Sequence, residues 1–541
     1  MDKLTLNDLL AKGYFPRELP PPFRTMSFAD AVTKNKKSLP VEFTHGKPIW
    51  CAFTPYSLAR PGSLRRRIAI LNPLAFYRLA KEVVAGQKRL FQLAARGGIA
   101  ISAPIVKSKN SRAIEYSVAL REFPRVRAQR RVAKCYALTT DVSRFYPSIY
   151  THSLDWAIQG KAKAKAGLKV KGKANLGSRI DKLVQAGQEG QTRGIPIGPD
   201  TSILLAHVLL GAVDKRLRAG GFAVGTRFMD DYELLFESRS EAERGLAALE
   251  EALAEYELEL NPQKTSIEEL PISIEDEAIE ELRTFPIRTT SQGQRFDLLH
   301  YFNRAFALAK QKPDRPILRY VVGRLRRQKV TRSCCELLQE LVLQAASVEP
   351  GVWPKAIPCI QRLRATNTKI PAAPLGEVVD MLVRQQSPRG HSSEVAWSLW
   401  AAVVFGLNIR KKTANAVLDM GDDVCALILL HAHALKLVQP GVKWHKLSTY
   451  LTTQELRGRH WLLAYEAEKK GWLKPSAGSA VAGDGVFEFL RKQGVEFYDV
   501  TAIPAPPKPV VKKLEVAPAD GVYEEEPEVE FQEDSDELDY N

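Results

Sequence analysis

Cysteine is scarce in this chain, and the few cysteines have no spacing typical of a metal site. The 541 residues contain six cysteines, at positions 51, 135, 334, 335, 359 and 425. They form no C-x-x-C pair and have no His-rich context, which argues against structural zinc and against a disulfide framework. We therefore expect a reducing compartment, the cytoplasm, as the place where the protein works.

Long hydrophobic runs are also missing. The longest lie near residues 203–213 and 395–407, and both are shorter than the roughly 20 residues that a transmembrane helix needs. The N-terminal segment has no apolar core followed by a small-residue cleavage site. We expect a soluble, untargeted protein with no membrane partner.

Lysine and arginine are absent from residues 514–541, which contain twelve acidic residues. Removing these twelve charges from the formal net charge of +16 leaves +28 on residues 1–513. An excess of positive charge of this size usually serves phosphate backbones. Charge alone also fits a solvated basic surface, so it indicates a nucleic-acid partner without identifying one.

The residue pattern divides the chain into four zones. We expect an N-terminal Pro-rich arm at 1–40, a mixed strand and helix region at 41–290, an almost wholly helical region at 291–500, and a Pro-rich linker with an acidic tail at 501–541. The predicted class is α+β followed by an all-α array, with a plain helical bundle as the alternative. The last zone has too little apolar surface to offset the entropy of ordering.

Carboxylates occur at two places where strands are predicted to end. ALTTDVSRFYPSIY places Asp141 near a strand end, and GTRFMDDYELLF places Asp230 and Asp231 at a tight turn between two strands. Adjacent carboxylates repel unless cations neutralise them, and a third carboxylate beside them makes a site for Mg²⁺. Two such ions suit nucleotidyl transfer, because they activate a 3′-hydroxyl and neutralise the departing pyrophosphate. Either motif alone is also an ordinary turn.

A second aspartate pair provides a contrast. MGDDV at 420–424 has the same adjacent carboxylates, but it precedes the helical run VCALILLHAHALKLV. Acidic residues at that position cap a helix N-terminus and interact favourably with its dipole. We therefore predict a structural role for this pair.

Further elements occur in a fixed order around the first carboxylates. TRGIPIGPDTSILLAHVLL, a Gly/Pro-rich loop followed by an apolar helix, lies between them, and LELNPQKTSI with Lys264 follows them. This order resembles the motif series of reverse transcriptases over residues 105–265. Three other stretches resemble the bacterial abortive-infection and defence-associated reverse transcriptases, namely GYFPRELPPPF at 13–23, SLRRRIAILNP at 63–73 and HSSEVAWSLW at 391–400. That resemblance implies right-hand polymerase fingers and palm, with a HEAT-like helical array in place of a thumb, in a bacterial cytoplasm.

The resemblance implies roles for the residues of the catalytic motifs. Asp141 and Asp230 would be the main ligands of two Mg²⁺ ions, for which Mn²⁺ is a substitute, and Asp231 would be a looser ligand. The main chain of Arg144 and Phe145 would border the triphosphate.

Other positions are predicted to contact the nucleotide or the leaving pyrophosphate. The ring of Tyr146 would lie under the sugar and leave little room for a 2′-hydroxyl. Arg193, before Gly194, stands where many reverse transcriptases have Gln. Lys264 would stabilise or protonate the leaving pyrophosphate, although a solvated surface role is the alternative. Arg112, in a basic stretch upstream of Asp141, is a further candidate for nucleotide binding.

The predicted function is RNA-directed or untemplated DNA synthesis in antiphage defence. The implied partners are dNTPs, an RNA template or associated non-coding RNA, a DNA product and further copies of the chain in a homo-oligomer. An RNA-dependent RNA polymerase and a catalytically silent nucleic-acid-binding scaffold are the alternatives. The Lys-rich insert at 160–175 is predicted to contact phosphates, with a solvated loop as the alternative. Tyr523 and Tyr540 in the tail are candidate primers for protein-linked synthesis, and the alternative is an acidic tail that covers the basic nucleic-acid groove.

Overall fold

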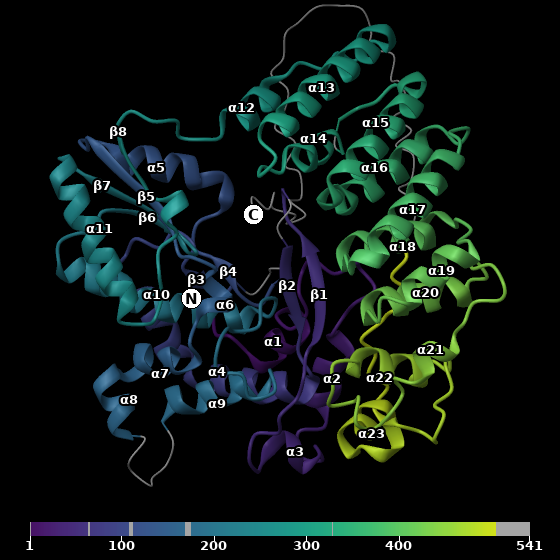
Figure 1. Ribbon diagram of the computed structural model, residues 1–541, viewed down its shortest axis with the longest axis horizontal. Helices are drawn as coiled ribbons and strands as arrows, with labels where there is room; N and C mark the ends of the chain where they lie inside the picture. Colours follow the sequence, from purple (N-terminus) through teal and green to yellow (C-terminus); the bar gives the residue numbers. More distant parts are fainter. Residues whose placement is uncertain (1, 63–64, 108–111, 168–174, 327, 505–541) are drawn as a thin grey trace, which may run out of the picture. The chain divides into compact units, whose positions relative to one another are not determined.

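The structure is a computed structural model that describes residues 2–62, 65–107, 112–167, 175–326 and 328–504 (Figure 1). The chain divides into two compact units. The first joins the residues up to 281 to residues 375–503, and the second contains residues 282–374. The sequence-based zone boundaries remain predictions, and each unit is described by itself below.

A four-stranded antiparallel sheet forms the centre of the first unit. Its strands lie in the order β6 (Gly225–Phe228), β7 (Asp231–Phe236), β5 (Tyr136–Asp141) and β8 (Ser266–Glu269). Their aromatic and apolar residues predicted the strands of YALTTDV and TRFMDDYELLF, and these strands bury Leu138, Leu234 and Leu235. Strand β5 pairs with β7 so that Asp141 lies opposite Asp231. The strands predicted around both carboxylate motifs are therefore confirmed.

Helices cover this sheet. Helix α11 (Arg239–Ala254) packs on β5 and β7, and α10 (Asp200–Ala219) packs on α11 and on α4 (Pro73–Ala94) (Figure 1). Helix α4 begins where the Asn72 side chain accepts a hydrogen bond from the Leu74 N–H. Gly211 allows α10 to approach α4 closely, because a Cβ there would overlap the Leu93 carbonyl oxygen. The other helices of this region are α5 (Phe123–Arg131), α6 (Phe145–Ser148), α7 (Thr151–Gln159), α8 (Lys161–Gly167) and α9 (Leu176–Ala186).

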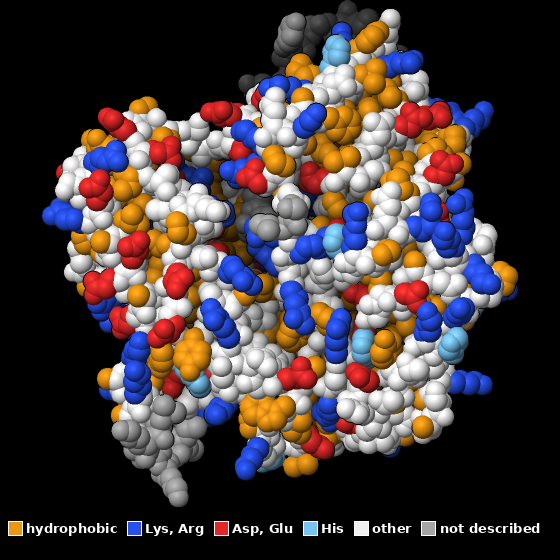
Figure 2. All heavy atoms as spheres, in the orientation of Figure 1, with side chains coloured by type: hydrophobic (Ala, Val, Ile, Leu, Met, Phe, Trp, Pro, Cys, Tyr) orange, Lys and Arg blue, Asp and Glu red, His pale blue; other side chains and the backbone are white. Residues whose placement is uncertain are grey.

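Two small hairpins belong to the same unit. Strands β1 (Thr54–Ala59) and β2 (Arg65–Ile70) pair antiparallel, and β3 (Pro104–Ile105) pairs with β4 (Glu115–Tyr116). Lys and Arg side chains stand close together over the β1–β2 hairpin (Figure 2). Part of the Lys-rich insert, residues 168–174, lies outside the described residues.

The N-terminal arm contains helices α1 (Leu6–Lys12), α2 (Met26–Lys34) and α3 (Val41–Thr44). The prolines at positions 16 and 20–22 lie between α1 and α2, where a continuous helix was predicted not to form. Tyr14 anchors the arm, because its buried ring stacks on Phe76 with a centroid distance of 4.2 Å. Its hydroxyl donates to the Leu71 carbonyl at 2.6 Å.

The C-terminal part of the first unit is helical. Its helices are α18 (Ser392–Phe405), α19 (Lys411–Leu418), α20 (Asp423–Ala434), α21 (His445–Ser448), α22 (Trp461–Lys469) and α23 (Gly485–Lys492). Helix α20 packs between α18 and α22, around the buried rings of Trp400 and Trp461. Asp422 caps α20 by accepting from the Cys425 N–H at 2.9 Å. The second aspartate pair is therefore structural, as predicted.

The second unit is also helical. It contains α13 (Ser291–Gln311), α14 (Ile317–Leu325), α15 (Cys335–Val348) and α16 (Trp353–Thr366), while α12 (Glu277–Thr284) and α17 (Ala373–Gln386) lie at its boundaries. Short 3-10 helices occur at Leu120–Glu122, Pro262–Lys264, Arg332–Cys334, Pro350–Val352, Ser387–Arg389 and Val481–Gly483. No helix within the described ranges has the length and hydropathy that a bilayer crossing requires. The chain thus has an α+β fold with a helical C-terminal region.

Candidate active site

Three predicted carboxylates meet at one end of the four-stranded sheet. Asp141 ends β5, Asp231 begins β7, and the antiparallel register places these two residues opposite each other. Directly opposed residues have Cβ atoms about 5 Å apart. Asp230 lies in the turn between β6 and β7. The structure therefore brings Asp141, Asp230 and Asp231 together, although Asp141 and Asp230 are 89 positions apart in the sequence.

The surrounding protein disfavours negative charge on the turn. Desolvation raises the pKa of Asp230 to about 7, and repulsion from Asp231 and Asp141 adds to the rise. Desolvation also raises the pKa of Asp231. Asp231 is nevertheless exposed at the end of its strand, so some solvent still reaches it. Lys264 opposes the rise for Asp231. A cation bound between these carboxylates would therefore be favoured over free ionised groups.

Asp141 has one oxygen ready for a ligand. Its Oδ2 is paired with the Lys264 Nζ at 2.6 Å, while its Oδ1 is buried and has no hydrogen-bond partner. A buried carboxylate oxygen without a donor fits a divalent cation, which prefers oxygen ligands. Across the described parts of the chain, no three side chains of His, Cys, Asp or Glu are already gathered as a metal site. The free Oδ1 of Asp141 therefore fits a metal ligand, but the three carboxylates are not arranged as a complete metal site.

Lys264 reaches Asp141 because the following loop is tied to the end of β5. The Asn261 N–H donates to the Asp141 carbonyl at 2.9 Å, and the Asn261 side chain accepts from the Gln263 N–H at 3.2 Å. These contacts start the short 3-10 helix that ends at Lys264. Lys264 therefore forms a direct ion pair with Asp141, and its predicted role toward the leaving pyrophosphate stays a prediction.

The segment after Asp141 turns sharply beside the Gly/Pro-rich loop. Arg144 adopts φ +45°, in the left-handed region, and starts the short helix α6. The Tyr146 carbonyl accepts from the Ile195 N–H at 3.1 Å, and the Gly194 N–H donates to the Ile149 carbonyl at 2.7 Å. The structure thus brings the 144–146 segment and the loop that follows Arg193 into contact. Their predicted roles toward a nucleotide remain predictions.

Phe145 and Tyr146 differ in their exposure. Phe145 is buried, and its ring lies 5.4 Å from the ring of Tyr146. Tyr146 is half-buried, and burial of its hydroxyl raises its pKa well above the ordinary value. The phenol therefore stays neutral and presents a ring rather than a charge.

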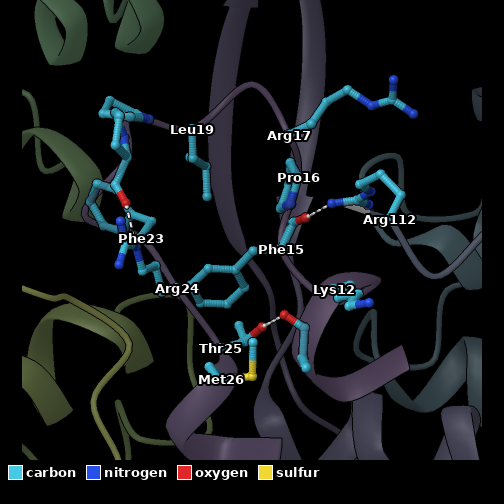
Figure 3. Close-up of a pocket in the computed structure, with 13 residues that line it drawn as sticks. Lys12, Phe15, Pro16, Arg17, Leu19, Phe23, Arg24, Thr25, Met26 and Arg112 are labelled. Atoms are coloured by element: carbon cyan, nitrogen blue, oxygen red, sulfur yellow. Dashed lines mark hydrogen bonds between the residues drawn. The ribbon is translucent and has the colours of Figure 1, made fainter. Parts of the chain in front are cut away.

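Arg112 is held by protein groups. Its guanidinium pairs with the buried Asp200 and donates to the Phe15 carbonyl at 2.9 Å. Arg112 lines a cavity of about 360 Å³ in the N-terminal arm, beside Phe15 and facing Phe23 and Arg24 (Figure 3). Its role in nucleotide binding stays a prediction, and the contacts in the structure join the arm to the start of α10.

Sequence reasoning missed the residues that support the turn. The Met229 N–H donates to the Ser102 Oγ at 2.7 Å, and the Met229 carbonyl accepts from Arg227 at 2.6 Å. Arg227 pairs with Asp214, and both side chains have no exposed surface. The sequence signal for this ion pair was a charged residue in each of two segments predicted to be buried: Arg227 in the strand TRF and Asp214 in the helix HVLLGAVD.

Sequence reasoning also missed basic residues on the β1–β2 hairpin. Arg66 favours the ionised form of Asp230, against the larger desolvation that raises the pKa of that carboxyl. Arg60, next to β1, acts in the same way on Asp231, whose pKa is likewise raised chiefly by desolvation. The hairpin therefore contributes positive charge to the carboxylate site.

One family model matches this part of the chain. Residues 70–292 match the family model described as reverse transcriptase (RNA-dependent DNA polymerase). A comparison with curated proteins finds no match. Among solved structures, apo telomerase from Candida tropicalis is similar with a TM-score of 0.32 and 11% identity, over 79% of this chain and 71% of the telomerase chain. The family match spans the sheet, the three aspartates and Lys264. Residues 70–292, a little under half of the chain, are therefore similar to the reverse-transcriptase (RNA-dependent DNA polymerase) family.

Proposed function

We propose that this chain is a two-metal reverse transcriptase of the bacterial defence-associated class, in which a helical region replaces the thumb. The observation that carries the catalytic part is the pairing of Asp141 with Asp231 beside the turn that holds Asp230. The unpartnered Oδ1 of Asp141 supports it further. Asp141 and Asp230 are the main metal ligands, and Asp231 is the looser one.

The protein groups around the carboxylates divide the remaining tasks. When bound, two Mg²⁺ ions lower the pKa of the attacking 3′-hydroxyl and neutralise charge on the phosphates. The backbone at Arg144 and Phe145 borders the triphosphate, and the ring of Tyr146 excludes a 2′-hydroxyl. Lys264, whose Nζ lies 2.6 Å from the Asp141 Oδ2, would stabilise or protonate the leaving pyrophosphate.

The decisive experiment neutralises the turn. Asp230→Asn with Asp231→Asn should lower dNTP incorporation on a primed RNA template by about 10³-fold or more, because the lost metal contacts supply several kcal/mol. Glu268→Gln with Glu269→Gln is the matched control, since these exposed carboxylates lie on β8 of the same sheet. Circular dichroism checks that both variants are folded.

Three outcomes separate the candidate functions. Incorporation near the wild-type rate in the Asp230/Asp231 variant would remove the site assignment. Incorporation of rNTPs in preference to dNTPs would make the enzyme an RNA polymerase. Wild-type protein that binds RNA but incorporates neither nucleotide would be a binding scaffold.

The defence assignment has its own support. The three stretches that resemble defence-associated enzymes contact one another within the first unit. Tyr14 of the first donates to the Leu71 carbonyl of the second, and Arg65 of the second pairs with Glu394 of the third at 2.5 Å. Trp397 of the third donates to the Glu18 carbonyl of the first at 3.2 Å.

A bacterial host that expresses the chain tests this assignment. The efficiency of plaque formation by a panel of phages should fall with the wild-type chain and recover with the Asp230/Asp231 variant. The Glu268/Glu269 control should protect as the wild type does. Equal plaque numbers with and without the wild-type chain for every phage would contradict a defence role and leave the polymerase assignment standing.

A further inference from the structure

The turn that carries the aspartate pair has an unusual backbone held from several sides. Met229 has φ +50°, a left-handed conformation that costs free energy for a residue with a Cβ. Its N–H donates to the Ser102 Oγ at 2.7 Å, and its carbonyl accepts from the Arg227 Nη1 at 2.6 Å. The next carbonyl, of Asp230, accepts from the Val142 N–H at 3.3 Å. Consecutive peptide groups of the turn are therefore fixed by groups outside it.

Arg227 is itself immobilised. Its Nε lies 3.0 Å from each carboxylate oxygen of Asp214, and its Nη2 lies 2.6 Å from the Asp214 Oδ2. The Tyr232 hydroxyl donates to the Asp214 Oδ1 at 3.1 Å. Because Asp214 is on α10, the ion pair joins the turn to this 20-residue helix. The guanidinium is thereby held so that its Nη1 donates to the Met229 carbonyl of the turn.

A histidine completes the network. The His207 Nδ1 lies 3.4 Å from the Arg227 Nη1, and its Nε2 lies 3.2 Å from the Met229 Sδ and 3.4 Å from the Ser102 Oγ. A guanidinium only donates, so Nδ1 accepts and the proton of a neutral ring is on Nε2. The imidazole thus bridges both groups that hold Met229.

Stability alone does not explain a buried ion pair at this place. Well-packed apolar residues of similar volume are often as stable as a buried pair, or more so. The Arg227–Asp214 pair delivers something that apolar residues cannot, a fixed donor for the carbonyl directly before Asp230. The same reasoning applies to the Ser102 hydroxyl, which accepts a hydrogen bond from the N–H of Met229.

We propose that Ser102, Arg227 and Asp214 are positioning residues that hold the Met229 peptide so that Asp230 and Asp231 face Asp141 in the geometry a divalent cation needs. This inference rests on the proposed function, which assigns these carboxylates to the cation. It adds that the preformed shape of the turn, and not the carboxylates alone, sets the affinity for the metal.

Ser102→Ala tests the proposal with the smallest change. Ser153→Ala is the matched control, because Ser153 is also fully buried and its hydroxyl also makes one hydrogen bond to the main chain, donating to the Tyr256 carbonyl at 2.9 Å. The measurement is Mn²⁺ binding to the full chain by electron paramagnetic resonance, with thermal unfolding alongside. Ser102→Ala should weaken Mn²⁺ binding about tenfold and raise the Mg²⁺ concentration for half-maximal incorporation. Ser153→Ala should lower the unfolding temperature similarly and leave both metal readouts unchanged.

A second variant removes the ion pair without leaving a lone charge. Arg227→Met with Asp214→Leu should fold, because it replaces a buried pair by apolar side chains of similar size. It should nevertheless bind Mn²⁺ at least tenfold more weakly than the wild type. Wild-type Mn²⁺ affinity in this variant, or equal affinity in the two serine variants, would overturn the proposal. Wild-type protein that binds no Mn²⁺ would overturn the proposed function first and this inference with it.

Discussion

At the residue scale, Tyr146 offers the sharpest test of nucleotide choice. Its carbonyl is tied to the Ile195 N–H, and its ring contacts the buried ring of Phe145. The backbone of Tyr146 is therefore held in place, and the residue lies on the segment that directly follows Asp141. In the proposed function, this ring would exclude a 2′-hydroxyl by its volume rather than by hydrogen bonding.

Tyr146→Ala should increase the use of rNTPs relative to dNTPs. Opening this space should change the ratio of the two kcat/KM values by about tenfold or more, the usual effect of one group on pocket discrimination. Tyr146→Phe is the control, because it keeps the ring and removes only a hydroxyl that stays neutral. Single-nucleotide extension of a labelled primer gives both values. A ratio unchanged by Tyr146→Ala would exclude Tyr146 from sugar selection.

The residues predicted from sequence and those missed differ in how they act. Asp141, Asp230 and Asp231 were predicted because their order and their flanking strands are local features of the chain. Ser102 and Arg227 act through tertiary hydrogen bonds, and no spacing in the sequence shows which backbone group each will meet. Arg112 shows the same limit, since its contacts with Asp200 and Phe15 depend on packing between distant segments.

At the element scale, the β1–β2 hairpin is clamped to the start of α18. Residues 391–394, the HSSE segment, supply the clamp: the Ser57 N–H donates to the Ser392 Oγ at 3.0 Å, and the Ala59 N–H donates to the Ser393 Oγ at 2.8 Å. Arg65 on β2 donates to both Glu394 oxygens, at 2.5 and 2.8 Å. The hairpin that brings Arg60 and Arg66 toward the carboxylates is therefore held by a helix 329 residues away from Arg65.

Glu394→Gln should loosen the β1–β2 hairpin without disturbing the four-stranded sheet that holds the aspartates. The change leaves the half-buried Arg65 without a charged partner, and the cost is about 2 kcal/mol or more. Amide hydrogen exchange of residues 54–59 should become faster, and the KM for dNTP should rise while kcat changes little. Glu377→Gln, at an exposed carboxylate on α17, is the control. Unaltered exchange in 54–59 would show that the HSSE segment does not hold the hairpin.

The elements themselves were largely predictable, and their contacts were not. Aromatic and apolar residues predicted β5 and the β6–β7 hairpin, and the acidic residues at 422–423 predicted the start of α20. The sequence indicated one helical region after residue 290. That domain boundary remains a prediction; in the structure, α18, α20 and α22 pack on one another within the first unit, and α13 to α16 belong to the second. Burial partners of this kind are a property of the folded chain.

At the scale of the whole molecule, charge is distributed unequally along the chain. Residues 1–513 carry +28, and the twelve acidic residues of 514–541 reduce the total to +16. The tail lies outside the described residues, so the expectation about it comes from sequence and electrostatics. An acidic segment competes with phosphates for basic groups, and this competition weakens as salt screens both partners.

Deleting residues 514–541 should therefore tighten RNA binding, several-fold at low salt and less at high salt. Fluorescence anisotropy with a labelled RNA at two or more salt concentrations measures this directly. A full-length control in which Asn and Gln replace the twelve acidic residues separates charge from length, and it should bind RNA as the deleted chain does.

A second control, Tyr523→Phe with Tyr540→Phe, keeps the charge and should bind RNA as the wild type does. If that tyrosine variant loses DNA that is covalently attached to protein, the tail supplies a primer hydroxyl. If the deleted chain binds RNA no more tightly than the wild type at any salt concentration, the tail does not compete for the basic surface.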